Sequence, residues 1–459
     1  MFEIDFKKPI HIYFIGIGGI SMSGLAEILL KQGFKISGSD TRESPLTQKL
    51  SSLNASIYYG QSVSHLDSSV DLVVYTAAIH PDNPEWLRMK ELQIPSLSRA
   101  ELLGQIMKNY KIPIAVSGTH GKTTTTSMIS QVLLASDTDP TLSIGGMLKT
   151  IGGNIRIGKS PCFVTEACEY TNSFLKFFPK IGIILNVEED HMDFFHDIHE
   201  IRESFHQFAA LLPCEGTLII NKEIEALDTI TGDLACSCLT YGFTPDCDYF
   251  ATDIHYNSMG LASYRLIRKD KEPVTVSLGV VGRHNISNSM AAFALSDLLG
   301  LDQETTCRAL QEFKGTDRRF EFKGQLGGIT IIDDYAHHPT EITATLTAAA
   351  NYPHKSLWCI FQPHTYTRTK AFLTEFAQAL SAADKIILAD IYAARETDTL
   401  GVSSEVLRDE LLKLGKECYY FPTFDEIENF LLQNSINGDL LITMGAGDIV
   451  KVGENLLGL

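Results

Sequence analysis

A short segment in the middle of the chain has the residue types of a phosphate-binding loop. Residues 117–124 read Ser-Gly-Thr-His-Gly-Lys-Thr-Thr and follow an apolar run over 112–116. Glycines let the backbone wrap a phosphate with its N–H groups pointing inward at a helix N-terminus. Lys122 would neutralise the β- and γ-phosphates, and the Thr123 hydroxyl would bind Mg²⁺. The predicted nucleotide contacts are Gly118, Thr119, His120, Gly121, Lys122, Thr123 and Thr124.

The loop departs from the full Walker pattern, which has a glycine five residues before Gly121. That position is Val116, so we predict one of the shorter variants of the loop. The alternative is a chance Gly-Lys-Thr turn. The strand pattern before the loop and the helical pattern after it favour the phosphate site.

A phosphate loop needs a metal partner, and two residues are placed to supply one. Glu166 follows the run Cys162–Thr165, at the carboxyl end of a predicted strand, where its carboxylate could share Mg²⁺ with Thr123. His191 follows another predicted strand and has Asp190 and Asp193 as neighbours. A lone histidine in an acidic loop is usually a surface residue, but its position on this edge predicts a second metal ligand.

A second glycine loop lies near the N-terminus. Residues 16–21, Gly-Ile-Gly-Gly-Ile-Ser, follow a predicted strand and nearly fit the dinucleotide fingerprint, with Ser21 in place of the third glycine. An NAD site and a UDP-type diphosphate site fit equally well, and a purely structural turn is the third alternative. The predicted contacts are Gly16, Gly18, Gly19, Ile20, Ser39 and Asp40.

The elements that must position these residues alternate along the chain: a short apolar run, a turn that often contains glycine, and then a helical pattern. This alternation predicts an α/β protein built from parallel sheets with helices on both faces. We predict three domains: a Rossmann-like domain over 1–107, a P-loop ATPase-type domain over 108–313 and a Rossmann-like domain over 314–459. Residues 241–281 are rich in β-formers and turn residues, which predicts antiparallel strands.

Composition limits the classes of function. The net charge of −18 argues against nonspecific binding to nucleic acid or anionic membranes. No run of about 18 apolar residues is present and the N-terminus lacks a signal-peptide pattern, so we expect no membrane insertion. The nine scattered cysteines are typical of reduced thiols in a cytoplasmic protein. We expect a monomer or a homodimer.

Motifs along the whole chain resemble those of the Mur ligase family. The strings GIGGISMSGLA, SGTHGKTTTTSM, EACEYTNSFL, NVEEDHMD, GRHNISNSMAA, DRRFE, DDYAHHPTE, FQPHTYTRT, DIYAARE and MGAGDI occur in the family's order. The phosphate loop alone would indicate the superfamily. DDYAHHPTE together with FQPH and YAARE resembles the branch that adds L-alanine, or the related murein-tripeptide ligases.

The resemblance implies a UDP-sugar-binding first domain, an ATPase second domain and a third domain that closes on ATP. It implies that ATP and Mg²⁺ activate the carboxylate of UDP-N-acetylmuramate as an acyl phosphate, which the amine of L-alanine then attacks. The implied catalytic residues are Lys122, Glu166, His191 and Arg319, and the implied metal ligands are Thr123, Glu166 and His191. Asn285 and His284 would line the adenine and metal region, with Asn288 on the adenine and Asp334 on the ATP ribose. The implied pocket for the amino acid and the muramoyl group contains His284, Tyr335, His337 and Arg368.

Two positions depart from the family's pattern. Thr365 stands where the family often has arginine, so Arg368 is the arginine that remains in that loop to meet a carboxylate. Gln61 stands where the family often has a histidine near the uracil.

The rival classes are another Mur-type ligase, a folate-polyglutamate synthetase, a nucleotide-binding regulator without activity, and an NAD-dependent dehydrogenase. The dehydrogenase leaves the phosphate loop unexplained, and the regulator is disfavoured by the complete set Lys122, Thr123, Glu166 and His191.

Overall fold

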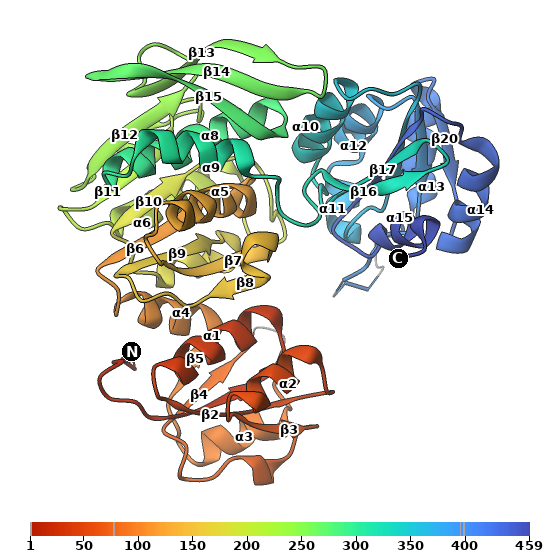
Figure 1. Ribbon diagram of the computed structural model, residues 1–459. Helices are drawn as coiled ribbons and strands as arrows, with labels where there is room; N and C mark the ends of the chain where they lie inside the picture. The colour runs from red at the N-terminus through yellow and green to blue at the C-terminus, as the bar shows by residue number, and fades with distance from the viewer. Residues whose placement is uncertain (1, 77–78, 395, 398–399) are drawn as a thin grey trace.

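The computed structural model describes residues 2–76, 79–394, 396–397 and 400–459. The chain forms three sheets, each accompanied by its own helices, and Figure 1 shows three bodies with the second in contact with both others. The predicted α/β fold with three domains is confirmed, whereas the exact boundaries after residues 107 and 313 stay a prediction.

The first sheet has five parallel strands in the order β3-β2-β1-β4-β5. The strand order reverses between β1 and β4, and such a switch point is where open α/β sheets bind ligands. The strands are β1 (His11–Ile15), β2 (Lys35–Asp40), β3 (Ser56–Tyr59), β4 (Leu72–Tyr75) and β5 (Ser96–Ser98). The helices are α1 (Ile20–Lys31), α2 (Pro45–Ser52), α3 (Pro84–Glu91) and α4 (Arg99–Met107), with a 3₁₀ turn η1 (Val63–His65).

The central sheet has ten strands in the order β15-β14-β13-β12-β11-β10-β6-β9-β7-β8. The strands are β6 (Ile112–Ser117), β7 (Thr141–Leu148), β8 (Gly153–Arg156), β9 (Cys162–Ala167), β10 (Ile181–Ile184), β11 (Thr217–Asn221), β12 (Ser237–Gly242), β13 (Tyr249–Tyr256), β14 (Leu261–Arg268) and β15 (Lys271–Val281). The helices are α5 (Lys122–Ala135), α6 (Ile198–Ala210), α7 (Asp228–Thr231), α8 (Arg283–Leu298) and α9 (Gln303–Glu312), with 3₁₀ turns η2 (Lys149–Ile151) and η3 (Tyr170–Lys176). The antiparallel strands predicted over 241–281 are confirmed as β13, β14 and β15.

The third sheet has six strands in the order β16-β17-β21-β18-β19-β20, of which only the edge strand β16 is antiparallel. The strands are β16 (Glu321–Leu326), β17 (Ile329–Asp334), β18 (Leu357–Phe361), β19 (Lys385–Leu388), β20 (Glu417–Tyr420) and β21 (Leu440–Met444). The helices are α10 (Pro339–Ala350), α11 (Tyr366–Ala371), α12 (Leu373–Leu380), α13 (Ser404–Lys413), α14 (Phe424–Asn434) and α15 (Val450–Leu457).

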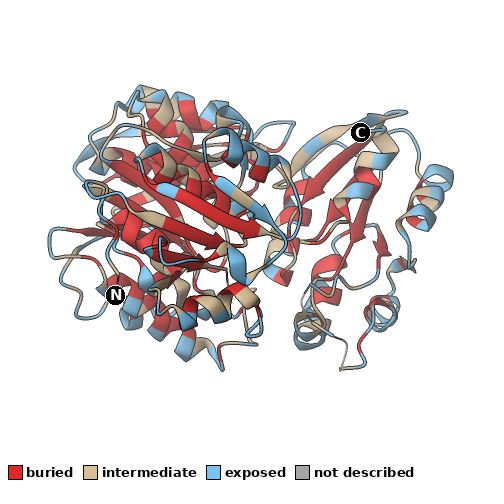
Figure 2. Cartoon of the chain, turned by 90° about the horizontal axis from the view of Figure 1, so that it is seen from below, coloured by how far each residue is buried: buried red, intermediate tan, exposed pale blue. Residues whose placement is uncertain are grey.

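Parallel strands covered by helices on both faces are mostly apolar along their whole length, and the inner strands of these sheets follow that rule. Every residue of β18 is buried, as is every residue of β11 and β21, and Figure 2 shows the sheets as buried strands inside more exposed helices. One continuous apolar cluster runs from the first domain to the near face of the central sheet. The contact is close, because a Cβ atom added at Gly104 of α4 would lie 1.9 Å from the Lys176 carbonyl oxygen.

Candidate active site

The phosphate loop connects β6 to α5, as predicted, and its backbone requires glycine. Gly118 has φ +141° and Gly121 has φ +84°, and a side chain is strained at both values. A Cβ atom added at Gly118 would lie 2.9 Å from the Cβ of Leu185. The Lys122 ammonium donates to the carbonyls of Gly118 at 2.5 Å and Thr119 at 3.0 Å, so the lysine folds back over its own loop.

Glu166 lies beside the loop because β9 pairs with β6, with Val116 opposite Glu166. Thr123 donates a hydrogen bond of 2.9 Å from its Oγ1 to Glu166 Oε2, and the Gly145 N–H donates to Oε1 at 2.5 Å. Burial raises the pKa of the Glu166 carboxyl, and these two hydrogen bonds oppose the rise. Two of the three predicted metal ligands are therefore in direct contact.

A second carboxylate, Glu169, completes this group and was not predicted from the sequence. Its Oε2 lies 2.9 Å from Lys122 Nζ, its Oε1 lies 3.8 Å from His191 Nε2, and the side chain is buried. Burial alone would lower the pKa of Lys122, but the charge and hydrogen bond of Glu169, together with other nearby groups such as Glu166, outweigh it and the pKa is raised. Glu169 follows Glu166 by three residues, and this Glu-x-x-Glu spacing after a strand is the signal that could have found it.

His191, the third predicted metal ligand, follows β10 on the other side of β6. It has φ +56° and lies 3.8 Å from a carboxylate oxygen of its neighbour Asp190. Asp190 in turn accepts a 2.9 Å hydrogen bond from Arg368 of the C-terminal domain. Burial would raise the pKa of Asp190, but the charges of Arg368 and His191 hold it well below its usual range.

A cavity of about 460 Å³ lies between the central and C-terminal domains and opens beside the phosphate loop. This size is within the usual range for small-ligand sites. Asn288 donates to Asn285 at 3.0 Å at one end of the cavity. The predicted residues that line it are His120, Gly121, Thr124, His284, Asn285, Asn288, Arg319 and Asp334.

Two titratable groups of this cavity have pKa values changed mainly by burial. Burial lowers the pKa of His284 to about 4, with further lowering by the charge of Arg319. Burial raises the pKa of Asp334 to about 6, although Arg319 and two backbone N–H groups, those of Phe320 and Ala336, oppose the rise. His284 is therefore neutral at physiological pH, and the Asp334 carboxyl titrates just below physiological pH.

Tyr335, His337 and Arg368 form a second group next to this cavity. The ring centroids of Tyr335 and His337 are 5.5 Å apart, and His337 lies 5.7 Å from the ring of His364. Arg368 contacts His364 Nδ1 at 3.3 Å. His364 was not singled out from the sequence, although it lies within the FQPHTYTRT motif. Thr365 has φ +65° and begins α11, the helix that carries Arg368.

The N-terminal glycine loop forms a separate group at the switch point of the first sheet. Asp40 Oδ2 accepts a 2.8 Å hydrogen bond from the Gly18 N–H, while Ile20 is exposed. Gly16 has φ +82° and turns the chain out of β1. Ser39 is fully buried and donates to Glu85 at 2.5 Å, so its hydroxyl is paired inside the domain and does not face solvent.

Arg99 was missed from the sequence and lies beside this loop. Its guanidinium donates to the Ser21 hydroxyl at 3.2 Å, and burial lowers its pKa. Within the ranges that the structure describes, no carboxylate lies at ion-pair distance from Arg99. A half-buried cation of this kind beside a glycine loop is suited to an anionic group of a ligand.

The remaining predicted features fall outside these groups. Gln61 is exposed at the end of β3. Arg395 of the DIYAARE motif and residues 77–78 of the loop after β4 lie outside the described residues. Across the described part of the chain, no helix combines the length and the apolar character needed to cross a membrane.

Comparison with known proteins gives matches over almost the whole chain. The models of the Mur ligase family catalytic domain, the Mur ligase middle domain and the Mur ligase glutamate ligase domain match residues 11–111, 116–296 and 318–447. The UDP-N-acetylmuramate–L-alanine ligase of Agathobacter rectalis is 57% identical over 457 residues, and the alignment covers 100% of both chains. The corresponding ligase of Caldanaerobacter subterraneus is 52% identical over 458 residues, with 99% of both chains covered.

Solved structures give the same result. The UDP-N-acetylmuramate–alanine ligase MurC of Thermotoga maritima superposes with a TM-score of 0.81 at 30% identity, over 98% of both chains. The murein peptide ligase of Psychrobacter arcticus superposes with a TM-score of 0.71 at 25% identity, again over 98% of both chains. The resemblance seen in the motifs is thereby confirmed, and the chain belongs to the Mur ligase family.

Proposed function

We propose that this protein is an ATP-dependent ligase that joins the carboxylate of UDP-N-acetylmuramate to the amine of L-alanine, a step in peptidoglycan precursor synthesis. The observation that carries the proposal is the pairing of Lys122 with Glu169 and of Thr123 with Glu166 beside a cavity between two domains. Relatives more than 50% identical over the full length are ligases for these two substrates, which supports this choice of substrates.

The residues around the loop suit Mg²⁺. This ion takes oxygen ligands from one or two carboxylates and from phosphates, and Thr123, Glu166 and Glu169 supply a hydroxyl, a half-buried carboxylate and a buried carboxylate. Three further observations fit a cation site. Burial raises the pKa of Glu166. Lys122 pairs with Glu169, and His191, which follows β10, approaches the same carboxylate. When bound, Mg²⁺ would neutralise charge on the β- and γ-phosphates.

The chain's own residues then have defined tasks. The muramoyl carboxylate oxygen attacks the γ-phosphorus, the bond to the β-phosphate oxygen breaks, and ADP leaves. Lys122 and Arg319 would stabilise the charge that develops on the transferred group. The neutral amine of L-alanine next attacks the acyl carbon, the bond from that carbon to the phosphate oxygen breaks, and inorganic phosphate leaves with the proton that the amine loses, so that an amide remains. No side chain has to act as a nucleophile, because positioning and electrostatics supply the rate.

The positions of the N-terminal glycine loop, of the cavity, and of the group with His337 and Arg368 suit this reaction sequence. The UDP-sugar would bind at the glycine loop of the first domain near Arg99, and ATP in the cavity between the second and third domains. Arg368 and His337 would hold the amino acid close to the phosphate loop, since Arg368 already contacts Asp190 next to His191. We expect the enzyme to work in the cytoplasm as a monomer or a homodimer.

The test is phosphate release from ATP with UDP-N-acetylmuramate and one acceptor at a time. We expect release with L-alanine, weaker release with glycine or L-serine, and none without an acceptor. A preference for an L-alanyl tripeptide over L-alanine would instead identify a murein peptide ligase, as the similar fold of the Psychrobacter arcticus protein allows. Absence of release with every acceptor would overturn the ligase proposal.

A further inference from the structure

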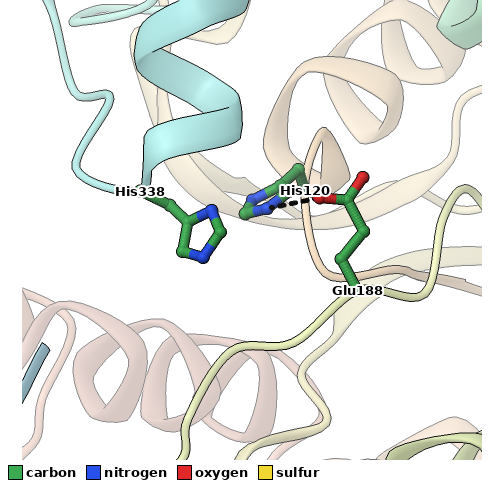
Figure 3. Close-up of side chains that lie close together, drawn as sticks. All are labelled: His120, Glu188 and His338. Carbon is green, nitrogen blue, oxygen red and sulfur yellow. Dashed lines mark ion pairs between the residues drawn. The ribbon is translucent and has the colours of Figure 1, made fainter. Parts of the chain in front are cut away.

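Three side chains from two domains meet at the edge of the cavity. His120 comes from the phosphate loop, Glu188 from the segment after β10, and His338 from the N-terminus of α10, as Figure 3 shows. One ring nitrogen of each histidine and one carboxylate oxygen of Glu188 all lie within 4.8 Å of one another. The two imidazole rings face each other with centroids 4.8 Å apart.

In the described part of the chain, one ring nitrogen of each histidine, Nε2, lacks a hydrogen-bond partner, whereas Nδ1 of His338 accepts from the Thr340 N–H at the start of α10. The Nε2 atoms of His120 and His338 are both buried and accept or donate no hydrogen bond within the described residues. His338 is only 5% exposed. A buried polar atom without a partner is costly to the folded state, so an arrangement with two of them needs an explanation. A bound ion would satisfy such atoms.

Nδ1 of His120 contacts a carboxylate, as the ring nitrogen that does not bind the metal does in many metal sites. Glu341 Oε1 lies 3.1 Å from His120 Nδ1 and fixes the orientation of the ring. A carboxylate on one nitrogen of a histidine directs the lone pair of the other nitrogen outward and makes it a better ligand. Here that other nitrogen, Nε2, lies 3.7 Å from Glu188 Oε2.

The group is accessible to an ion from two sides. His120 and Glu188 line the 460 Å³ cavity, and Glu188 and His338 line a second, more open cavity of about 420 Å³. The nearby arginines do not compete for the group, because Arg319 faces Glu341 and Arg368 is paired with Asp190.

We propose that His120, Glu188 and His338 form a site for Zn²⁺ or a similar divalent transition-metal ion that joins the central and C-terminal domains. Two imidazoles and a carboxylate are a typical zinc ligand set, which leaves a fourth position for water. Tetrahedral ligands at about 2.1 Å are about 3.4 Å apart, so atoms that now lie up to 4.8 Å apart must approach one another by up to about 1.4 Å. Mg²⁺ prefers oxygen ligands and would not select this site.

The site is distinct from the proposed Mg²⁺ site, which uses Thr123, Glu166 and Glu169. Its occupation has a structural consequence, because two ligands belong to one domain and the third to another. A bound ion would therefore stabilise the contact between the domains. The inference does not depend on the proposed ligase activity and can be tested without any substrate.

The experiment is calorimetric titration of the metal-free full chain with Zn²⁺ in excess Mg²⁺. We expect one Zn²⁺ to bind per chain at this site and the unfolding temperature to rise. In His338→Ala and in Glu188→Gln the affinity should fall at least tenfold and the rise in unfolding temperature should be lost. Co²⁺ bound at the same site should show d–d absorption without thiolate charge-transfer bands, because no cysteine is a ligand.

The matched control is His196→Ala, which removes an exposed histidine outside the group and should leave the titration unchanged. His338→Gln is a milder second variant, and the unfolding temperature of each variant without metal checks that it folds. The proposal is overturned if properly folded His338→Ala and Glu188→Gln bind Zn²⁺ as tightly as the unsubstituted protein. Thiolate bands with Co²⁺ would overturn it as well.

Discussion

Lys122 Nζ lies 2.9 Å from a carboxylate oxygen of Glu169, where the Glu169 side chain is buried and the Lys122 side chain is half-buried. A charge pair of this kind compensates the lysine charge when no phosphate is bound. Glu169 also approaches His191 at 3.8 Å, so a single carboxylate connects Lys122 with the histidine after β10. An arriving triphosphate would take over the lysine and leave Glu169 free to hold Mg²⁺.

Lys122→Ala should therefore reduce phosphate release by at least about 10³-fold, since a charge aimed at the transferred group is lost. Binding of UDP-N-acetylmuramate should remain within about twofold of the unsubstituted protein, because its proposed site is in the first domain. The measurements are steady-state phosphate release and calorimetric binding of the sugar nucleotide. Lys31→Ala, at the exposed end of α1, is the control. Turnover that survives Lys122→Ala would mean that the loop has another role.

Glu166→Gln and Glu169→Gln should each raise the Mg²⁺ concentration needed for half-maximal activity, by about 10- to 100-fold. Each substitution keeps the shape of the side chain and removes a charge that would face the ion. The measurement is activity against Mg²⁺ concentration at saturating substrates. Glu43→Gln on the surface should leave the curve in place. An unchanged Mg²⁺ requirement in both variants would contradict the proposed metal ligands.

Arg368→Lys should raise the KM for L-alanine by roughly 10- to 100-fold, because a lysine cannot form the two parallel hydrogen bonds that a guanidinium gives to a carboxylate. The KM for ATP should change by less than about threefold. Initial rates with each substrate varied in turn separate the two effects. Arg408→Lys, in the exposed helix α13, provides the comparison. Equal increases in both KM values would indicate damage to the domain interface, where Arg368 contacts Asp190.

Asp334 should make ATP binding depend on pH, because burial raises its pKa to about 6. As the pH rises through about 6 the carboxyl ionises and becomes a better acceptor for the ribose hydroxyls, so affinity should increase several-fold. His284 and His337, whose pKa values burial lowers to about 4, stay neutral over this window.

The measurement for Asp334 is the ATP dissociation constant between about pH 5 and pH 7.5 in the unsubstituted protein and in Asp334→Asn. The ratio of the two constants cancels the titration of ATP itself. We expect this ratio to change across the window in the direction of tighter binding by the unsubstituted protein at higher pH. A constant ratio would remove Asp334 from the ribose contact.

The sequence by itself determined the α/β class, the division into three sheets and the phosphate loop. These depend on local patterns: apolar runs such as 112–116, a following glycine turn, and a helix. Strands with weaker patterns, such as β3, β5 and β8, were not found, because they are short and lie at or near sheet edges. The motif strings identified the family because many residues of defined type recur in a defined order.

The tertiary structure alone decided which distant residues meet. That Glu166 contacts Thr123 depends on β9 pairing with β6, and this pairing is a long-range choice that no local pattern contains. The contacts of Glu169 with Lys122 and of Arg99 with Ser21, and the approach of His120 to His338, likewise depend on how strands and domains pack together. The physical reason is that periodicity and turn residues encode the local path of the chain, whereas burial and charge pairing depend on the whole fold.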